Sequence, residues 1–296
     1  DAGTADTGEH ERLEHEYRRL EEHARSLERL VSSQQATYAE LEAYARSLER
    51  RLLPQVLTVI VHPRATPQLE HCLRAALASE GVAVTIVLLL NGCDDPLPGW
   101  MDGEPRIHVL RLTDPLGFGA ANNRAVQWAL ARLPAPHHFF FLNNDAALRR
   151  DALRRMIEAL DAEPRAGVAG PTLVVWGAED HLNSLGLNLT RTAEAWDEGI
   201  GLPTAAYGPL PGRHEVVAVT GAALLVRAET WRELGGWSEL FDFYMEDLDL
   251  CLRAQGLGWK VVQVADAEAA HAVSATAGAF SEFKVRLFWR NRWVLL

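Results

Sequence analysis

Cysteine, basic charge and long apolar runs are all scarce in this chain of 296 residues. The three cysteines (Cys72, Cys93 and Cys251) provide neither a disulfide framework nor a close CxxC metal spacing. Lys and Arg number 29 against 40 Asp and Glu, and the net charge of −11 argues against a nucleic-acid binder, because phosphate contacts need a basic surface. No apolar run approaches the roughly 20 residues of a membrane span, and no signal peptide is visible. These absences predict a reducing, cytoplasmic setting.

A heptad pattern occupies the amino-terminal part of the chain. Apolar residues alternate at spacings of four and three without a slip, which is typical of a left-handed coiled coil. The seam consists of Leu13, Tyr17, Leu20, Ala24, Leu27, Val31, Gln34, Tyr38, Leu41, Ala45, Leu48 and Leu52. We expect an oligomerisation helix; the alternative is a single amphipathic helix folded back on its own domain. Pro54 ends the helix, since proline cannot continue a helix interior.

The remainder of the chain alternates strands and helices. Apolar, β-branched or aromatic runs predict strands at 56–61, 82–90, 107–112 and 139–142, with helices at 68–79 and from 117 to about 133. This order is typical of an α/β nucleotide-binding fold. Further on, the patterns predict a helix around 156–160, a strand near 168–171, a strand pair at 216–227 and a last strand at 259–264. Residues 181–212 form a long polar segment, either a functional loop or one carrying small strands.

The most apolar strand ends in polar residues. Phe139 to Leu142 are all large and apolar, so we expect this strand to be buried on both faces. It is followed by Asn143, Asn144 and Asp145, and α/β sheets bind their ligands at the carboxyl ends of their strands. Asp145 is therefore a candidate cation ligand, whereas the alternative is a plain polar turn.

Two glycines precede the helix that starts near residue 117. Gly117 and Gly119 permit a tight turn and a close approach of the backbone to a ligand. A helix amino terminus that follows them is suited to phosphate or hydroxyl groups. Gly-Phe-Gly is also common in ordinary turns, and Asn122 and Asn123 are equally suited to capping.

Three acidic residues crowd the first turn of a later helix. Glu246, Asp247 and Asp249 are favoured there by the helix dipole, which is the structural explanation. They also lie between aromatic residues and an apolar helix face. Repulsion between like charges and partial burial would raise the pKa of one of them and make it a candidate base.

Two features close the chain. His271 lies in a segment of small residues, where a single histidine is more often structural than a ligand. Residues 280–296 are aromatic and basic. They predict a helix that covers the core, or an interfacial helix that makes peripheral contact with an anionic membrane surface.

These motifs together resemble those of the inverting glycosyltransferases of family 2, in particular the rhamnosyltransferase-type members that build bacterial cell-surface glycans. The resemblance covers Val56 to Leu296. It rests on residues 116–123, 141–145, 219–223, 235–237 and 244–250, and on His271 with Ser274, in the family's order. It implies the α/β GT-A fold, a mixed sheet flanked by helices, preceded here by the coiled-coil helix.

Together with the heptad pattern, the resemblance divides the chain into four parts. Residues 1–53 are the oligomerisation helix and 54–150 the nucleotide-sugar-binding half of the GT-A domain. Residues 151–277 are the acceptor-binding and catalytic half, and 278–296 the carboxy-terminal aromatic and basic helix.

Individual roles follow from the same resemblance. Asp145 and His271 are the implied ligands of Mg²⁺ or Mn²⁺, and Asp247, beside Glu246, is the implied general base. Gly221, Trp237 and Tyr244 are implied to contact a glycan or lipid-linked glycan acceptor. The donor is a dTDP-, UDP- or GDP-sugar, implied to lie against His62, Pro63, Leu90, Asn91, Gly117, Gly119, Asn122, Asn143 and Asn144.

Several positions depart from the family's pattern. Val61-His62-Pro63 replaces Thr-Tyr-Asn, Leu90 replaces the aspartate before Asn-Gly, and Asn143 replaces the first aspartate of Asp-x-Asp. Trp289 stands where the processive signature Gln-x-x-Arg-Trp has glutamine, which favours single addition. The altered base-binding residues leave open a catalytically degenerate binding or scaffold protein organised by the coiled coil. A nucleotidyltransferase is a weaker alternative, because it would need a basic phosphate loop where only Arg64 stands.

Overall fold

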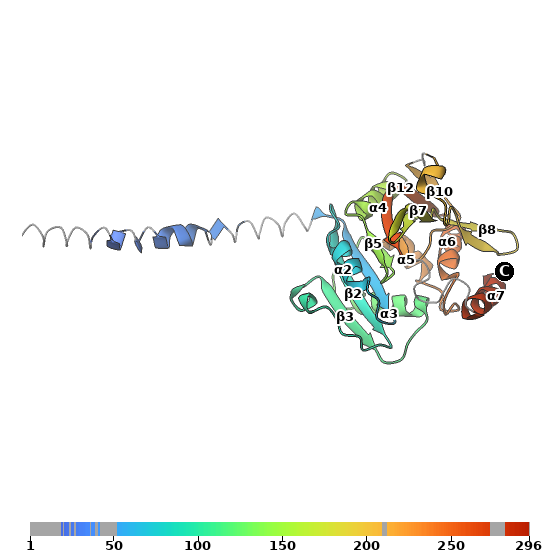
Figure 1. Ribbon diagram of the computed structural model, residues 1–296, viewed down its shortest axis with the longest axis horizontal. Coiled ribbons are helices and arrows are strands. Elements are labelled where there is room, and N and C mark those ends of the chain that lie inside the picture. Colours follow the sequence, from blue (N-terminus) through green and yellow to red (C-terminus); the bar gives the residue numbers. More distant parts are fainter. Residues whose placement is uncertain are drawn as a thin grey trace, which may run out of the picture. The chain divides into compact units, whose positions relative to one another are not determined.

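The computed structural model describes residues 52–208, 212–272 and 282–295, and residues 19, 21–23, 25–26, 28–35, 37–38 and 41 of the amino-terminal segment. The chain forms two compact units, Asp1–Leu52 and Leu53–Leu296 (Figure 1). The described residues of the first unit are helical, as predicted. Of the heptad seam, Val31, Tyr38 and Leu41 are 50%, 67% and 62% exposed; most other seam positions lie outside the described residues. The pairing of this helix with a second copy stays a prediction.

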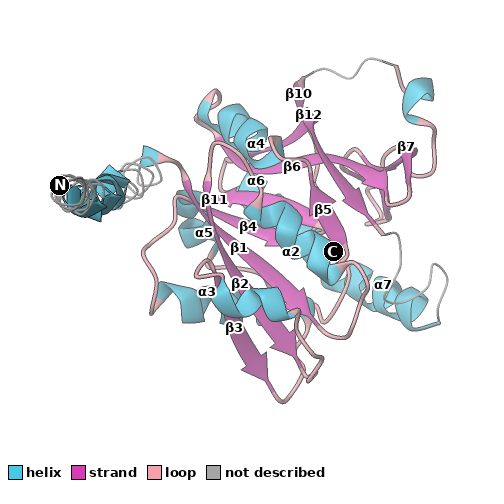
Figure 2. Cartoon of the chain, turned by 60° about the vertical axis from the view of Figure 1, so that its left-hand side comes forward, coloured by secondary structure: helices cyan, strands magenta, loops and turns pink. Residues whose placement is uncertain are grey.

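The second unit is built on a ten-stranded sheet in the order β10-β12-β6-β11-β4-β1-β2-β3, with β5 paired to β12 and β7 to β6. Strands β3, β2, β1 and β4 run parallel, β11 is antiparallel to both β4 and β6, and β12 is parallel to β6. This is the mixed sheet that the resemblance implies (Figure 2). The strands are β1 (Gln55–His62), β2 (Ala83–Asn91), β3 (Ile107–Leu112), β4 (His138–Leu142), β5 (Ala146–Leu148), β6 (Ala166–Val175), β7 (Ala178–Ser184), β10 (Arg213–Glu215), β11 (Ala223–Arg227) and β12 (Lys260–His271). A separate hairpin joins β8 (Leu187–Leu189) and β9 (Ala195–Asp197).

Helices cover both faces of the sheet. Because side chains alternate along a strand, β4 contributes to two cores. Phe140 and Leu142 pack with α2 (Leu69–Leu77) and α4 (Ala152–Asp161). Phe139 and Phe141 pack with α3 (Phe118–Leu130), α5 (Ala228–Leu234) and α6 (Glu246–Gly256). All five residues of β4 are buried, as predicted for a strand covered on both sides.

The remaining helices are short or lie late in the chain. Two 3₁₀ helices are η1 (Gly99–Gly103) and η2 (Thr204–Ala206), and α7 (Glu282–Leu295) forms the last described element. None of the helices in the described part of the chain has the length and apolar character that crossing a bilayer requires.

Some boundaries differ from the prediction. The strand pair expected at 216–227 is wrong, since only β11 is formed and residues 216–222 are irregular apart from a single bridge at Ala218. The small residues Thr220, Gly221 and Ala222 form a turn there, with the Ala223 N–H donating to the Thr220 carbonyl. The segment 181–212 carries β7, β8 and β9, in line with the small strands considered for it. His271 ends β12 instead of lying in a loop.

Candidate active site

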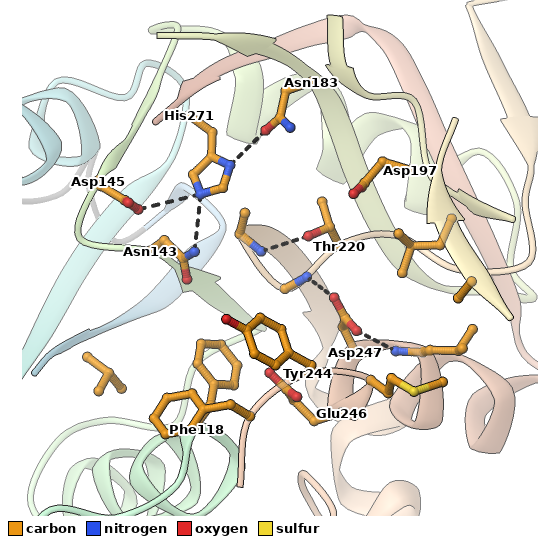
Figure 3. A pocket seen from close by; sticks show the side chains of 18 of the residues that line it. Phe118, Asn143, Asp145, Asn183, Asp197, Thr220, Tyr244, Glu246, Asp247 and His271 are labelled. Carbon is orange, nitrogen blue, oxygen red and sulfur yellow. Dashed lines mark hydrogen bonds and ion pairs between the residues drawn. The ribbon is translucent and has the colours of Figure 1, made fainter. Parts of the chain in front are cut away.

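A cavity of about 450 Å³ opens at the carboxyl ends of several strands (Figure 3). Val61 and Pro63 reach it from β1, Asn91 from β2, and Asn143 to Asp145 follow β4. Its volume is in the range of small-molecule sites, which lie preferentially at this edge of an α/β sheet. The sheet therefore brings the predicted polar residues together as expected.

One corner of the cavity holds Asp145 and His271. His271 Nε2 lies 3.5 Å from Asp145 Oδ1 and 3.3 Å from Asn143 Nδ2, and Asp145 is only 4% exposed (Figure 3). Two adjacent ligands bound at about 2.1 Å to an octahedral Mg²⁺ lie roughly 3 Å apart. A buried carboxylate and an imidazole nitrogen at this separation fit a single divalent cation, because both groups are common metal ligands.

Behind this corner, His62 supports Asn144. Asn144 Nδ2 donates to His62 Nδ1 (2.8 Å), and His62 Nε2 lies 3.3 Å from Asp95 Oδ2. Burial lowers the pKa of His62, although the Asp95 carboxylate partly offsets this. His62 is 1% exposed and lies behind the wall of the cavity, so it holds Asn144 in place and is not positioned to contact a ligand.

A second group of acidic side chains lines the cavity at the start of α6. Asp247 Oδ2 accepts the Gly221 N–H (2.9 Å) and Oδ1 accepts the Leu248 N–H (2.8 Å). Burial raises the pKa of Asp247, and these hydrogen bonds offset only part of that rise. The pKa of Glu246 is raised well above its ordinary value, first by burial and then by the charge of Asp247. Glu246 thus keeps its proton to a higher pH, which leaves Asp247 as the carboxylate of the pair that is available to accept a proton.

The two residues before these acids have left-handed backbones. Tyr244 and Met245 have φ values of 71° and 73°, which residues other than glycine rarely adopt. The Tyr244 ring stacks on Phe288 of α7, with ring centroids 5.0 Å apart at 23°. Strained backbone of this kind tends to occur at functional sites, where the surrounding packing holds it in place.

The predicted site residues fall into two groups. Those that line the cavity are Pro63, Asn91, Asn143, Asn144, Asp145, Gly221, Tyr244, Glu246, Asp247 and His271. Those that lie elsewhere are His62, Leu90, Gly117, Gly119, Asn122 and Trp237. Leu90, for example, is 0% exposed and belongs to the core.

Packing explains the second group. A Cβ at Gly117 would lie 2.8 Å from the Asp242 carbonyl oxygen, and one at Gly119 would lie 2.8 Å from that of Ser238. The lack of a side chain at these two glycines thus allows the backbone of a neighbouring loop to pack closely against them. Their placement does not support the predicted contact with a ligand. Trp237 is 3% exposed and packs edge-on against Phe118 and Phe141, so its placement does not support an acceptor contact.

Other lining residues were missed by sequence reasoning. Among them are Asn183, Trp196, Asp197 and Phe288. Three of these come from the segment 181–212, and the length of this polar segment was the only sequence feature that suggested a functional role for it. Phe288 lies in the carboxy-terminal helix, which was predicted to cover the core or touch a membrane.

The chain matches the family described as glycosyltransferase like family 2 over residues 54–295. The chain belongs to this family. The resemblance stated from the motifs is therefore confirmed, and the amino-terminal segment lies outside the matched range.

Two relatives are similar in sequence to this family 2 domain. An N-acetylglucosaminyl-diphospho-decaprenol L-rhamnosyltransferase of Mycobacterium tuberculosis is 26% identical over 231 residues, covering 72% of this chain and 74% of the relative. The O-antigen biosynthesis protein RfbC of Myxococcus xanthus is 27% identical, covering 66% of this chain and 15% of that protein.

Two solved structures share the fold. The mannosyltransferase PcManGT from Pyrobaculum calidifontis, in complex with GDP-Man and Mn²⁺, has a TM-score of 0.54 at 16% identity and covers 82% of this chain. GalNAc-T7 with UDP, GalNAc and Mn²⁺ has a TM-score of 0.58 at 12% identity and covers 75% of this chain. The family 2 domain spans 62% and 44% of those two chains, so the likeness establishes the GT-A fold alone.

Proposed function

We propose that this family 2 domain is a metal-dependent, inverting glycosyltransferase that moves one sugar from a nucleotide-diphospho-sugar to an acceptor hydroxyl. The observation that carries the proposal is that one cavity is lined by two separate acidic centres (Figure 3). Asp145 with His271 would hold Mg²⁺ or Mn²⁺, and Asp247 lies at the start of α6 as a base. When bound, the cation would neutralise charge on the leaving diphosphate.

The reaction divides between these centres. Asp247 accepts the proton of the acceptor hydroxyl as its oxygen forms a bond to the anomeric carbon of the donor. The bond from that carbon to the diphosphate oxygen breaks, and its electron pair leaves with the nucleoside diphosphate. A single displacement inverts the configuration. The raised pKa of Asp247 suits this role, because a base is most effective when its pKa approaches the working pH.

The donor and acceptor are proposed at the level of class. The solved neighbours carry UDP or GDP-Man, and the mycobacterial relative is named for a lipid-linked acceptor and rhamnose. These names support a dTDP-, UDP- or GDP-sugar donor and a glycan or lipid-linked glycan acceptor. A lipid-linked acceptor would place the protein in the cytoplasm in peripheral contact with the membrane, and the altered processive signature supports single addition.

A binding assay tests the metal half of this proposal. UDP, dTDP or GDP with Mn²⁺ should raise the melting temperature of the chain, and Asp145→Ala should abolish the increase. No increase with any of the three diphosphates would contradict the proposal.

A hydrolysis assay tests the chemical half and the scaffold alternative. Asp247→Asn removes the base at nearly constant volume, so transfer or donor hydrolysis should fall by roughly 10²- to 10⁴-fold. The melting-temperature increase with diphosphate and Mn²⁺ should persist in this variant. If the wild-type chain binds diphosphate but neither transfers nor hydrolyses any sugar nucleotide, the scaffold alternative is favoured.

A further inference from the structure

Asn183 occupies an unusual position in the pairing of strands β6 and β7. Strand β7 pairs with β6 so that Ser184 lies opposite Leu173 and Leu182 lies opposite Val174. Two consecutive residues of β6 are thus paired with residues 184 and 182 of β7, and Asn183 between them has no paired residue on β6. Asn183 is therefore the extra residue of a β-bulge. Bulges occur preferentially beside active sites, where they redirect a side chain.

The redirected side chain contacts His271. Asn183 Oδ1 lies 2.7 Å from His271 Nδ1, and Asn183 is 5% exposed, so this is a short contact away from solvent (Figure 3). His271 lies on β12, which is the neighbour of β6 on the side opposite to β7. The contact therefore joins the two strands that flank the carboxyl-terminal part of β6, Leu173 to Val175.

The contact selects one tautomer of the imidazole. A carbonyl oxygen at 2.7 Å accepts a hydrogen bond, so the ring must carry its proton on Nδ1. Independently, the Asn143 amide nitrogen lies 3.3 Å from Nε2 and requires a lone pair there. The opposite tautomer would require both amides to be reversed. Both contacts thus place the unprotonated nitrogen of the ring at Nε2, which lies 3.5 Å from Asp145 Oδ1.

We propose that Asn183 is a positioning residue that fixes the tautomer and orientation of His271, so that Nε2 is ready to bind a divalent cation. The inference rests on the proposed metal role of His271 and Asp145. Histidine ligands of metals usually donate their other N–H to such a partner, and loss of the partner lowers metal affinity roughly 10- to 100-fold.

Three variants separate this role from a structural one. Asn183→Leu removes the acceptor at similar size, whereas Asn183→Asp keeps an acceptor oxygen and cannot donate. Ser184→Ala is the matched control, because Ser184 is similarly buried (1% exposed) on the same strand and its hydroxyl, among the described residues, bonds to Gly186 of its own turn.

Mn²⁺ affinity is measured by electron paramagnetic resonance, with UDP, dTDP or GDP present. We expect a dissociation constant roughly 10- to 100-fold higher for Asn183→Leu, and an unchanged or lower one for Asn183→Asp. Ser184→Ala should lower the melting temperature and leave the dissociation constant unchanged. An unchanged constant in Asn183→Leu, or failure of Asn183→Asp to preserve binding, would overturn the inference.

A metal-free readout keeps the inference separate from the proposed function. Nitrogen NMR of the wild-type chain, at a pH where the His271 ring is neutral, should show a proton on Nδ1 and none on Nε2. A ring protonated on Nε2 would overturn the role of Asn183 and leave the proposed transfer reaction untouched. Conversely, absence of Mn²⁺ binding to the wild-type chain with every diphosphate would contradict the metal dependence, and the ring tautomer would still decide the role of Asn183.

Discussion

The side-chain amide of Asn291 in α7 donates a hydrogen bond to the backbone carbonyl of Tyr244, at 2.7 Å and across 47 residues of sequence. The same nitrogen donates to the Phe243 carbonyl at 2.8 Å, and Asn291 is 0% exposed. These bonds hold the left-handed turn at Tyr244 and Met245 that leads directly into Glu246 and Asp247. The carboxy-terminal helix thus contributes to the position of the proposed base.

Replacing this amide should affect both stability and rate. Asn291→Leu removes a buried amide that donates hydrogen bonds to two part-buried carbonyls, so we expect a loss of about 2 kcal/mol in the free energy of unfolding. The strained turn should also relax, and kcat should fall more than KM rises. Chemical denaturation and steady-state kinetics measure the two effects. Trp293→Ala, on the same helix but 74% exposed, is the control and should change neither.

Glu246 should make stability depend on pH. Its pKa is raised well above the ordinary 4.5, so the folded state binds this proton more tightly than the unfolded state. Its stabilising contribution is therefore present at low pH and lost as the pH rises from 4.5 through the higher folded pKa. Glu246→Gln stays neutral, so we expect it to gain stability relative to wild type between pH 5 and pH 8, measured by urea unfolding. A difference independent of pH would contradict the assignment of a raised pKa.

Two glycines should respond differently to the same substitution. At Gly117 an added Cβ would meet the Asp242 backbone at 2.8 and 2.9 Å, so Gly117→Ala should cost roughly 1–3 kcal/mol of stability. At Gly221 the nearest contacts are ordinary ones at 3.5 Å, and the residue lines the cavity beside Asp247. Gly221→Ala should therefore keep the melting temperature and lower activity. Reversal of this pattern would mean that Gly117 approaches the ligand and not the neighbouring loop.

The sequence predicted the residues that follow strand ends, because strand periodicity and sheet polarity are local signals. Asp145 and Asn91 lie at the cavity for this reason. The sequence did not reveal that His62 and Leu90 lie behind the cavity wall. Their placement depends on which face of each strand is covered. Trp237 was misjudged for the same reason: its neighbours Phe118 and Phe141 are distant in sequence. Asn183 could not be found at all, because its direction is set by a bulge, and register is a property of the paired strands.

The exposed heptad seam of the amino-terminal helix leads to a separate prediction about oligomerisation. In the single chain, Val31, Tyr38 and Leu41 of the heptad seam are at least half exposed, which is unfavourable for a row of large apolar side chains unless another helix covers them. Analytical ultracentrifugation should therefore show an oligomer for residues 1–296 and a monomer for residues 54–296. Leu41→Glu, which places a charge in the seam, should also give a monomer, whereas Glu40→Gln beside it should not. If residues 1–296 sediment as a monomer, the seam is covered within one chain and the helix has another role.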